Sequence, residues 1–96
     1  MTYVKIEWIH DFVDTPEIYL IEIGYDGYET KKIEKFKGGL INFASDTLES
    51  GTFLSPEPFG EIEIYNFTNE SERMKAYHIS ELEFYNEWNK ITSEIS

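Results

Sequence analysis

Two histidines and two aspartates are the side chains best suited to acid–base or metal chemistry. His10 and Asp11 are adjacent, Asp14 lies close by, and His78 stands far along the chain. An imidazole beside a carboxylate is a pairing that general acid–base catalysis uses. Consecutive residues of a strand point to opposite faces, so His10 and Asp11 converge only if the strand has already ended. We therefore expect His10 to cap a strand end by bonding to loop backbone, and we assign no catalytic residue, metal ligand or cofactor.

The composition excludes several classes of site. The chain has no cysteine, which rules out disulfides, a thiol nucleophile and thiolate metal sites. It also lacks a glycine-rich phosphate loop, zinc-type ligand spacing and a nucleophile elbow. The longest apolar run, residues 18–21, is far shorter than the ~20 residues of a membrane span, and the start lacks a signal-peptide layout. We therefore expect a cytoplasmic protein with no membrane partner.

Charge is the strongest compositional signal. The 96 residues include 19 Asp and Glu but only 8 Lys and Arg, which gives a net charge of −11. Nucleic acids and anionic membranes bind basic surfaces, so we expect a basic protein partner instead. Residues 6–30 and 38–72 each hold seven acids and no Lys or Arg, whereas four lysines crowd into residues 31–37.

This charge distribution has two interpretations. The base-free stretches form either an acidic docking face, which steers and holds a basic partner, or a solubilising surface. In the second interpretation, the lysine-rich strand is an exposed sheet edge that its charges protect.

The elements that would position these side chains are mainly strands. Residues 2–10 alternate between apolar and polar with the period of a half-buried strand. Asp26-Gly27 predicts a two-residue type I′ turn, and Gly38-Gly39 predicts a second tight turn. The four strands that follow from these signals cover residues 2–10, 17–25, 28–37 and 40–44.

The first of these turns also sets a register. Pairing Tyr25 with Tyr28 places Leu20 opposite Ile33, and places Glu22 opposite Lys31. We expect the apolar pair on one face of the sheet and the charge pair on the other. Ile33 and Phe36 have opposite parity, which predicts either a third strand buried on both faces or a bulge.

The second half of the chain ends in a helix. Residues 45–60 predict a long irregular loop, residues 61–67 suit a short strand and a helical turn equally, and residues 74–79 predict a last short strand. Ser80 to Glu83 forms a capping box, from which a helix begins. Its apolar stripe comprises Phe84, Trp88, Ile91 and Ile95. The chain is thus predicted to be one α+β domain, residues 1–96, with an antiparallel meander of four or more strands packed against a C-terminal helix.

The chain resembles a small uncharacterised bacterial family, a domain of unknown function. The resemblance begins at Trp8-Ile9-His10-Asp11-Phe12, and Val13 and Thr15 replace a proline and a glutamate common in that segment of the family. Further matches are Gly27-Tyr28-Glu29, Lys32-Ile33-Glu34, Phe36, Gly39, Ala44, Ile79-Ser80, Phe84 and Trp88. They span most of the chain and are weakest between residues 48 and 74. The family is similar to proteins encoded beside polymorphic toxins, which implies an immunity-type role and brings no catalytic residues.

The expected function is therefore an immunity-type inhibitor that neutralises a basic, nuclease-like bacterial toxin by stoichiometric masking. The alternatives are a phage-type inhibitor that mimics nucleic-acid charge, and a small enzyme or ligand-binding domain built on His10 and Asp11. We expect the contact within residues 57–72, where exposed aromatic anchors stand among acids. The expected partner-binding residues are Asp11, Asp14, Glu57, Phe59, Glu61, Glu63, Tyr65, Phe67, Glu70 and Glu72.

Overall fold

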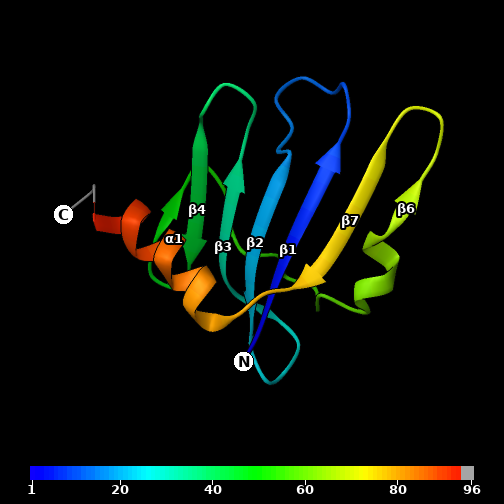
Figure 1. Cartoon of the computed structure of the whole chain (residues 1–96). Helices are drawn as coiled ribbons and strands as arrows, with labels where there is room; N and C mark the ends of the chain where they lie inside the picture. Colours follow the sequence, from blue (N-terminus) through cyan, green and yellow to red (C-terminus); the bar gives the residue numbers. More distant parts are fainter. Residues whose placement is uncertain (94–96) are drawn as a thin grey trace.

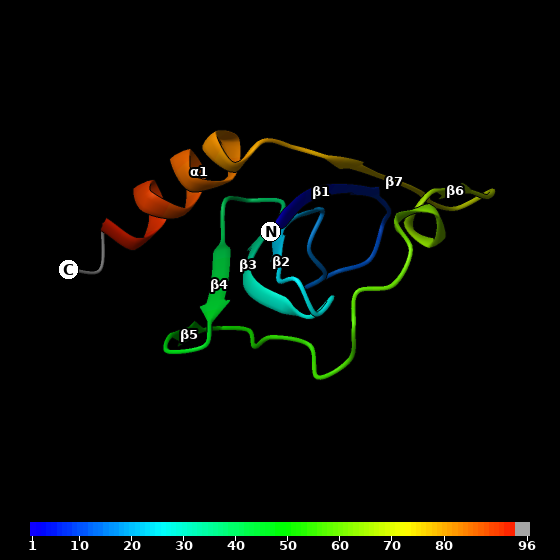
Figure 2. The ribbon, with the colours of Figure 1, turned by 90° about the horizontal axis from the view of Figure 1, so that it is seen from below.

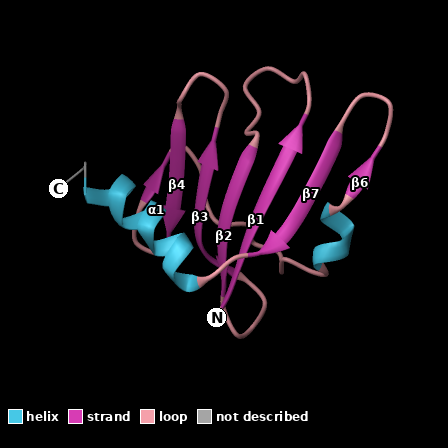
Figure 3. Cartoon of the chain, in the orientation of Figure 1, coloured by secondary structure: helices cyan, strands magenta, loops and turns pink. Residues whose placement is uncertain are grey.

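An antiparallel sheet in the order β5-β4-β3-β2-β1-β7-β6 forms the centre of the computed structural model, which describes residues 1–93 (Figure 1). A 3₁₀ helix, η1, precedes β6, and one α-helix, α1, ends the described chain (Figure 3). This arrangement confirms the predicted α+β meander with a C-terminal helix. The elements are β1 (Thr2–Ile9), β2 (Ile18–Ile23), β3 (Glu29–Lys35), β4 (Ile41–Ser45), β5 (Glu49–Ser50), η1 (Ile62–Tyr65), β6 (Phe67–Thr68), β7 (Arg73–His78) and α1 (Glu81–Ser93).

The register of the β2–β3 hairpin is the predicted one from Ile18 to Glu22, and it shifts between Glu22 and Ile23, which lies opposite Glu29. Leu20 lies opposite Ile33, and Glu22 lies opposite Lys31, with Glu22 Oε1 3.2 Å from Lys31 Nζ. The expectation that these pairs occupy opposite faces was wrong. Residues two apart in a strand share a face, so Leu20 and Glu22 both point towards α1 and are both buried.

The turn of this hairpin differs from the predicted type I′ turn. The Gly27 N–H donates to the Gly24 carbonyl at 3.0 Å, so the turn begins one residue earlier than expected. A type I′ turn needs positive φ at both central residues, and among the non-glycine residues of the described chain only Asp14 has positive φ. Asp26 therefore does not have the positive φ that the predicted turn requires, and only Gly27 of that pair, with φ 86°, is in the left-handed conformation.

The lysine-rich strand is not a sheet edge, which corrects the second interpretation of the charge pattern. The Gly38-Gly39 turn, with φ of 88° and 97°, brings β4 back along the outer side of β3. β3 consequently lies between two neighbours and does not end the sheet. Its lysines form ion pairs, Lys31 with Glu22, Lys32 with Glu29 and Lys35 with Glu87.

Phe36 belongs to the β3–β4 turn and not to a strand. β3 ends at Lys35, and the Phe36 N–H donates to the Leu40 carbonyl at 2.9 Å. The opposite parity of Ile33 and Phe36 therefore requires neither a bulge nor a third strand buried on both faces.

Helix α1 packs on one face of the sheet. It begins as predicted, because the Glu83 N–H donates to Ser80 Oγ at 3.0 Å and so satisfies one of the free N–H groups of the first turn. Ile79 and Ile91 pack against the same core, and Ile95 of the predicted stripe lies outside the described residues. The core on this face comprises Tyr3, Leu20, Ile33, Phe43, Phe84 and Trp88.

Residues 51–66, the covering segment, cross the opposite face of the sheet. Figure 2 shows this segment on the far side of the strands from α1. It contributes Phe59 to a second core, with Ile62 and Tyr65 packed around it. Both faces of the sheet are therefore covered, whereas the sequence predicted a cover only on the face that carries the helix. Residues 61–67, which suited a strand and a helical turn equally, contain both: the 3₁₀ turn η1 and then the start of the short strand β6. The second core comprises Val4, Ile6, Ile21, Ile23, Phe59 and Ala76.

Short strands and two asparagine side chains close the two edges of the sheet. β5 and β6, the outermost strands, have two residues each. Next to β6, the side-chain amide of Asn66 pairs with the backbone of Ala76: the Ala76 N–H donates to Oδ1 at 3.1 Å, and Nδ2 donates to the Ala76 carbonyl at 3.2 Å. At the other edge, Asn42 Nδ2 donates to the Gly51 carbonyl at 3.3 Å. Within residues 1–93, no helix has the length and apolarity that crossing a bilayer demands.

Candidate functional site: an acidic groove

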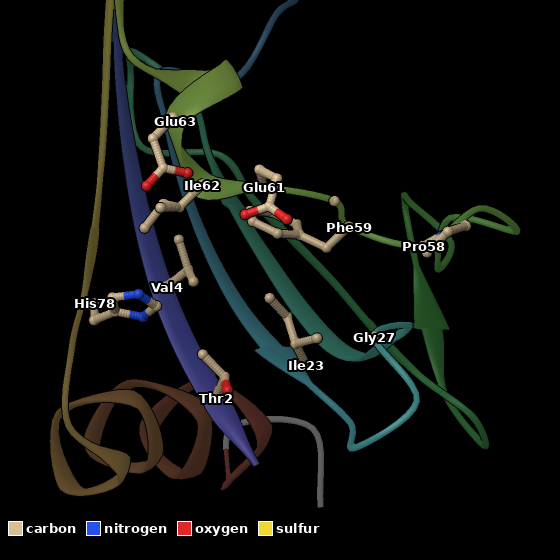
Figure 4. A pocket seen from close by; sticks show the side chains of 11 residues that line it. Thr2, Val4, Ile23, Gly27, Pro58, Phe59, Glu61, Ile62, Glu63 and His78 are labelled. Carbon is tan, nitrogen blue, oxygen red and sulfur yellow. The ribbon is translucent and has the colours of Figure 1, made fainter.

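A cavity of about 520 Å³ lies where the covering segment crosses the start of β1 and the ends of β2 and β7 (Figure 4). We call this cavity the acidic groove. Its apolar floor consists of half-buried Ile62 and exposed Pro58 over the nearly buried Val4, Ile23 and Phe59, and Glu61 and Glu63 stand at its rim. Thr2, Gly27, Gly60 and His78 complete the lining.

The groove exists because the covering segment is fastened at Phe59. The Phe59 N–H donates to the Gly27 carbonyl at 2.9 Å, and Tyr65 Oη donates to the Phe59 carbonyl at 2.8 Å. The two rings stack with centroids 4.5 Å apart. Gly60 follows with φ 82°, a conformation that side chains disfavour, and the chain then turns into η1 with both glutamates at the surface.

Two of the three expected aromatic anchors are therefore structural. Phe59 is 7% exposed and Tyr65 is half-buried, because both rings pack into the second core. The expectation that they are exposed contacts was wrong. Phe67, on the edge strand β6, is 39% exposed, as predicted for a surface aromatic.

The rim carboxylates carry unneutralised charge. The ion pairs within residues 1–93 use Glu7, Glu22, Glu29 and Glu87, and none of them uses an acid of residues 57–72. Glu61 and Glu63 are exposed, which leaves their charges available to a ligand. An apolar floor beside two such carboxylates can bind a group that is aliphatic along its length and cationic at its tip.

The structure does not gather all the expected contact residues on this groove. Phe59, Glu61 and Glu63 line it, and exposed Glu57 precedes it in the chain. Glu70 and Glu72 follow β6, at the end of the sheet that the β1–β2 loop also occupies (Figure 1). Glu72 there accepts a hydrogen bond from Trp8 Nε1 at 3.1 Å, which gives it a structural partner.

His10 caps the end of β1, as predicted. Its side chain is 2% exposed, its Nε2 lies 2.9 Å from the Pro16 carbonyl, and its Nδ1 accepts the Phe12 N–H at 3.0 Å. Because Nδ1 accepts, the proton is on Nε2, which donates to Pro16. Both ring nitrogens are therefore engaged with loop backbone, and exposed Asp11 makes no contact with the ring that would create a catalytic pair.

The segment with the strongest family resemblance is thus an architectural motif. Alternate residues Trp8, His10 and Phe12 pack their rings together: Trp8 meets His10 edge to face with centroids 4.4 Å apart, and His10 stacks on Phe12 with centroids 5.2 Å apart. The loop they hold presents exposed Asp11 and Asp14 beside a hollow of about 420 Å³. Lys37 also lines this hollow, so its two acids stand beside a base, and it lies at the opposite end of the sheet from the groove (Figure 1).

Glu22 is a carboxylate that sequence reasoning did not identify as buried. It accepts hydrogen bonds from Tyr3 and Tyr85 at one oxygen, and from Thr30 and Lys31 at the other. Burial raises the pKa of Glu22, but these donors outweigh burial, so its pKa lies below the ordinary value of 4.5. Burial, followed by the hydrogen bond to Glu22, raises the pKa of Tyr85 to about 12. All four donors are internal, so the cluster fastens α1 to β1, β2 and β3 and is not a ligand site.

Metal binding finds no geometric basis in the described residues. Across residues 1–93, no three His, Cys, Asp or Glu side chains are grouped so that they could hold a metal ion.

Comparison with known proteins places the chain in a family. A family model described as a domain of unknown function, DUF6881, matches residues 2–93. No curated protein and no solved structure matches the chain. The match extends from the first residue of β1 to the last residue of α1, so it covers the sheet, the covering segment and the groove together. The resemblance to a small uncharacterised family is confirmed, and the chain belongs to the DUF6881 family.

Proposed function

We propose that the protein is an immunity-type inhibitor, a cytoplasmic binding module that neutralises a basic, nuclease-like bacterial toxin by masking it. The observation that carries the proposal is the acidic groove, where rim carboxylates without ion-pair partners stand over a formed apolar floor. A stoichiometric binder needs a surface of this kind and no chemistry of its own. The resemblance to families found beside polymorphic toxins supports the same role.

The groove supplies both components of such a contact. A net charge of −11 steers a basic partner over distances of about a Debye length, roughly 8 Å at physiological salt. Charge alone gives little affinity, since exposed ion pairs contribute only about 0–1 kcal/mol each. The accessible apolar surface of the groove, chiefly Ile62 and Pro58, adds a contact that binding would desolvate, in place of the predicted anchors Phe59 and Tyr65.

The proposal requires a toxin gene beside the gene of this protein, and the test uses the basic domain that such a gene encodes. Replacing Glu61 and Glu63 by lysine changes the net charge from −11 to −7, two changes of +2 each. We expect this double variant to bind the toxin on the order of 100-fold more weakly, because two charge pairs become repulsive. Both side chains are exposed, so the melting temperature should stay within a few degrees of wild type.

A matched double variant separates the groove from overall charge. Asp46→Lys with Glu49→Lys makes the same change in net charge on exposed positions in the β4–β5 region. This control variant should associate with the toxin moderately more slowly than the wild type and dissociate at the same rate. In a separate measurement, higher salt should slow the association of the wild-type protein with the toxin. Equal losses in both double variants would move the contact away from the groove. A toxin that the wild type neither binds nor inhibits would refute the proposed function.

A further inference from the structure

The groove has the form of a site for a single extended side chain. Its volume of about 520 Å³ falls within the roughly 300–1,000 Å³ typical of pockets that enclose small ligands. Figure 4 shows the carboxylates of Glu61 and Glu63 at the same end of this pocket, with Thr2 at the other end. Val4 and Ile23 lie beneath the space between these ends and are only 1% and 7% exposed, so half-buried Ile62 and exposed Pro58 supply most of the apolar surface that a ligand can reach. A ligand that fits must be apolar along its stem and cationic at one tip.

The pocket is held in shape before any ligand arrives. Its wall is fixed by the bonds from Phe59 N–H to Gly27 and from Tyr65 Oη to Phe59, and the strands beneath it are paired. A preformed site avoids the ordering cost of closing around a ligand. The rim charges also lack a competitor, since no ion pair of the described residues reaches Glu61 or Glu63.

Arginine satisfies these requirements better than lysine. A guanidinium presents five N–H donors in one plane and can donate to two carboxylates at once, whereas an ammonium is a compact and strongly hydrated point charge. The methylene stem of arginine would lie on the floor while its head meets the rim. We propose that the acidic groove is an arginine-selective site, which receives one arginine side chain of the partner. That the arginine belongs to a toxin rests on the proposed function; the selectivity of the pocket does not.

The experiment uses three capped tripeptides with the wild-type protein at low salt. They are acetyl-Gly-Arg-Gly-amide, its lysine counterpart and its citrulline counterpart, in which the arginine head is replaced by a neutral group of the same shape. Titration is followed by the methyl NMR signals of Val4 and Ile23. We expect the arginine peptide to shift both signals and to bind at least tenfold more tightly than citrulline, and severalfold more tightly than lysine.

Variants identify the groups responsible. Glu61→Gln with Glu63→Gln keeps the shape of the rim and should reduce arginine binding to the level of citrulline. Asp46→Asn with Glu49→Gln, the matched control, should bind the arginine peptide as the wild type does. Equal binding of arginine and lysine, or of arginine and citrulline, would overturn the proposal, as would arginine binding that survives in the glutamine variant.

The outcome is independent of the toxin experiment. Arginine selectivity in a protein that ignores the toxin would retain the site and reject the proposed function. Loss of toxin binding in the lysine double variant, combined with no peptide selectivity, would retain the proposed function and reject the arginine site.

Discussion

Replacing Glu22 by glutamine tests whether the buried carboxylate cluster joins the helix to the sheet. The two side chains have nearly the same shape, so the substitution removes charge and one acceptor without opening a cavity. The hydroxyls of Tyr3 and Tyr85 can rotate to accept from the new amide, but the ammonium of Lys31 has no lone pair and can only donate. Lys31 therefore loses its charged partner while its side chain stays 28% exposed.

The expected loss follows from that geometry. Removing one member of a buried ion pair costs about 3 to 5 kcal/mol, because the remaining charge is left without compensation. Lys31 reaches some solvent, so we expect the lower end, about 3 kcal/mol. For a domain of this size such a loss lowers the melting temperature by about 12 °C or more.

Urea unfolding at neutral pH measures the change in the free energy of unfolding. The matched control is Glu57→Gln at an exposed position, which should change the free energy of unfolding by less than about 0.5 kcal/mol. Acid provides a second readout. The folded pKa of Glu22 is lowered, so its contribution is complete above the unfolded pKa and is lost as pH falls through the folded pKa. The Glu22→Gln variant should lack that part of the acid dependence. A loss below 1 kcal/mol with unchanged acid dependence would refute the fastening role.

Two further predictions concern the same face of the sheet. Trp88→Ala should destabilise the domain by about 3 to 5 kcal/mol, because Trp88 is 8% exposed and packs on Phe43 and Phe84. Thermal unfolding measures the loss, and a melting temperature within two degrees of wild type would contradict the prediction. Stability should also fall in alkali, since the pKa of Tyr85 and of Tyr77 is raised from 10 to about 12. The two tyrosines therefore contribute to stability fully below pH 10, and this contribution is lost between pH 10 and 12. The midpoint of urea unfolding should fall across that pH range, and it should fall less in the Tyr85→Phe variant.

Local signals account for the parts of the fold that could be predicted. The Gly38-Gly39 turn and the Ser80 cap act through neighbouring backbone, so a short stretch of sequence is enough to reveal them. The pairing of Glu22 with Lys31 was predictable from the nearby turn signal, although the turn begins one residue earlier and a register shift between Glu22 and Ile23 makes up the difference. The cap formed by His10 was predictable from strand parity alone.

The rest depends on contacts between distant residues. Glu22 receives its hydrogen bonds from Tyr3 and Tyr85, which lie 19 and 63 positions away, so its burial has no local signature. The covering segment has no regular period because Gly27 and Glu29 fix its backbone from another hairpin. Sequence reasoning therefore identified the acids of the groove. It predicted as exposed two rings of the covering segment, Phe59 and Tyr65, that are buried and half-buried.

The alternation of rings over Trp8, His10 and Phe12 is a signal that could have been used. Three aromatic groups at every second position, from the end of a strand into the loop that follows, can point to one side and pack their rings together. Such spacing indicates a structural stack that holds a loop, which is what the structure contains.

The closed edges of the sheet restrict how another chain can attach. Strand addition needs a row of free N–H and C=O groups along an outer strand. Here the outermost strands are two residues long, and Asn66 occupies the N–H and C=O of Ala76 with its own amide. An incoming chain thus meets side chains and cannot easily extend the ladder. Recognition through side chains depends on which residues stand at the surface, whereas strand addition accepts many sequences, so this architecture favours selectivity and also opposes edge-to-edge aggregation at high concentration.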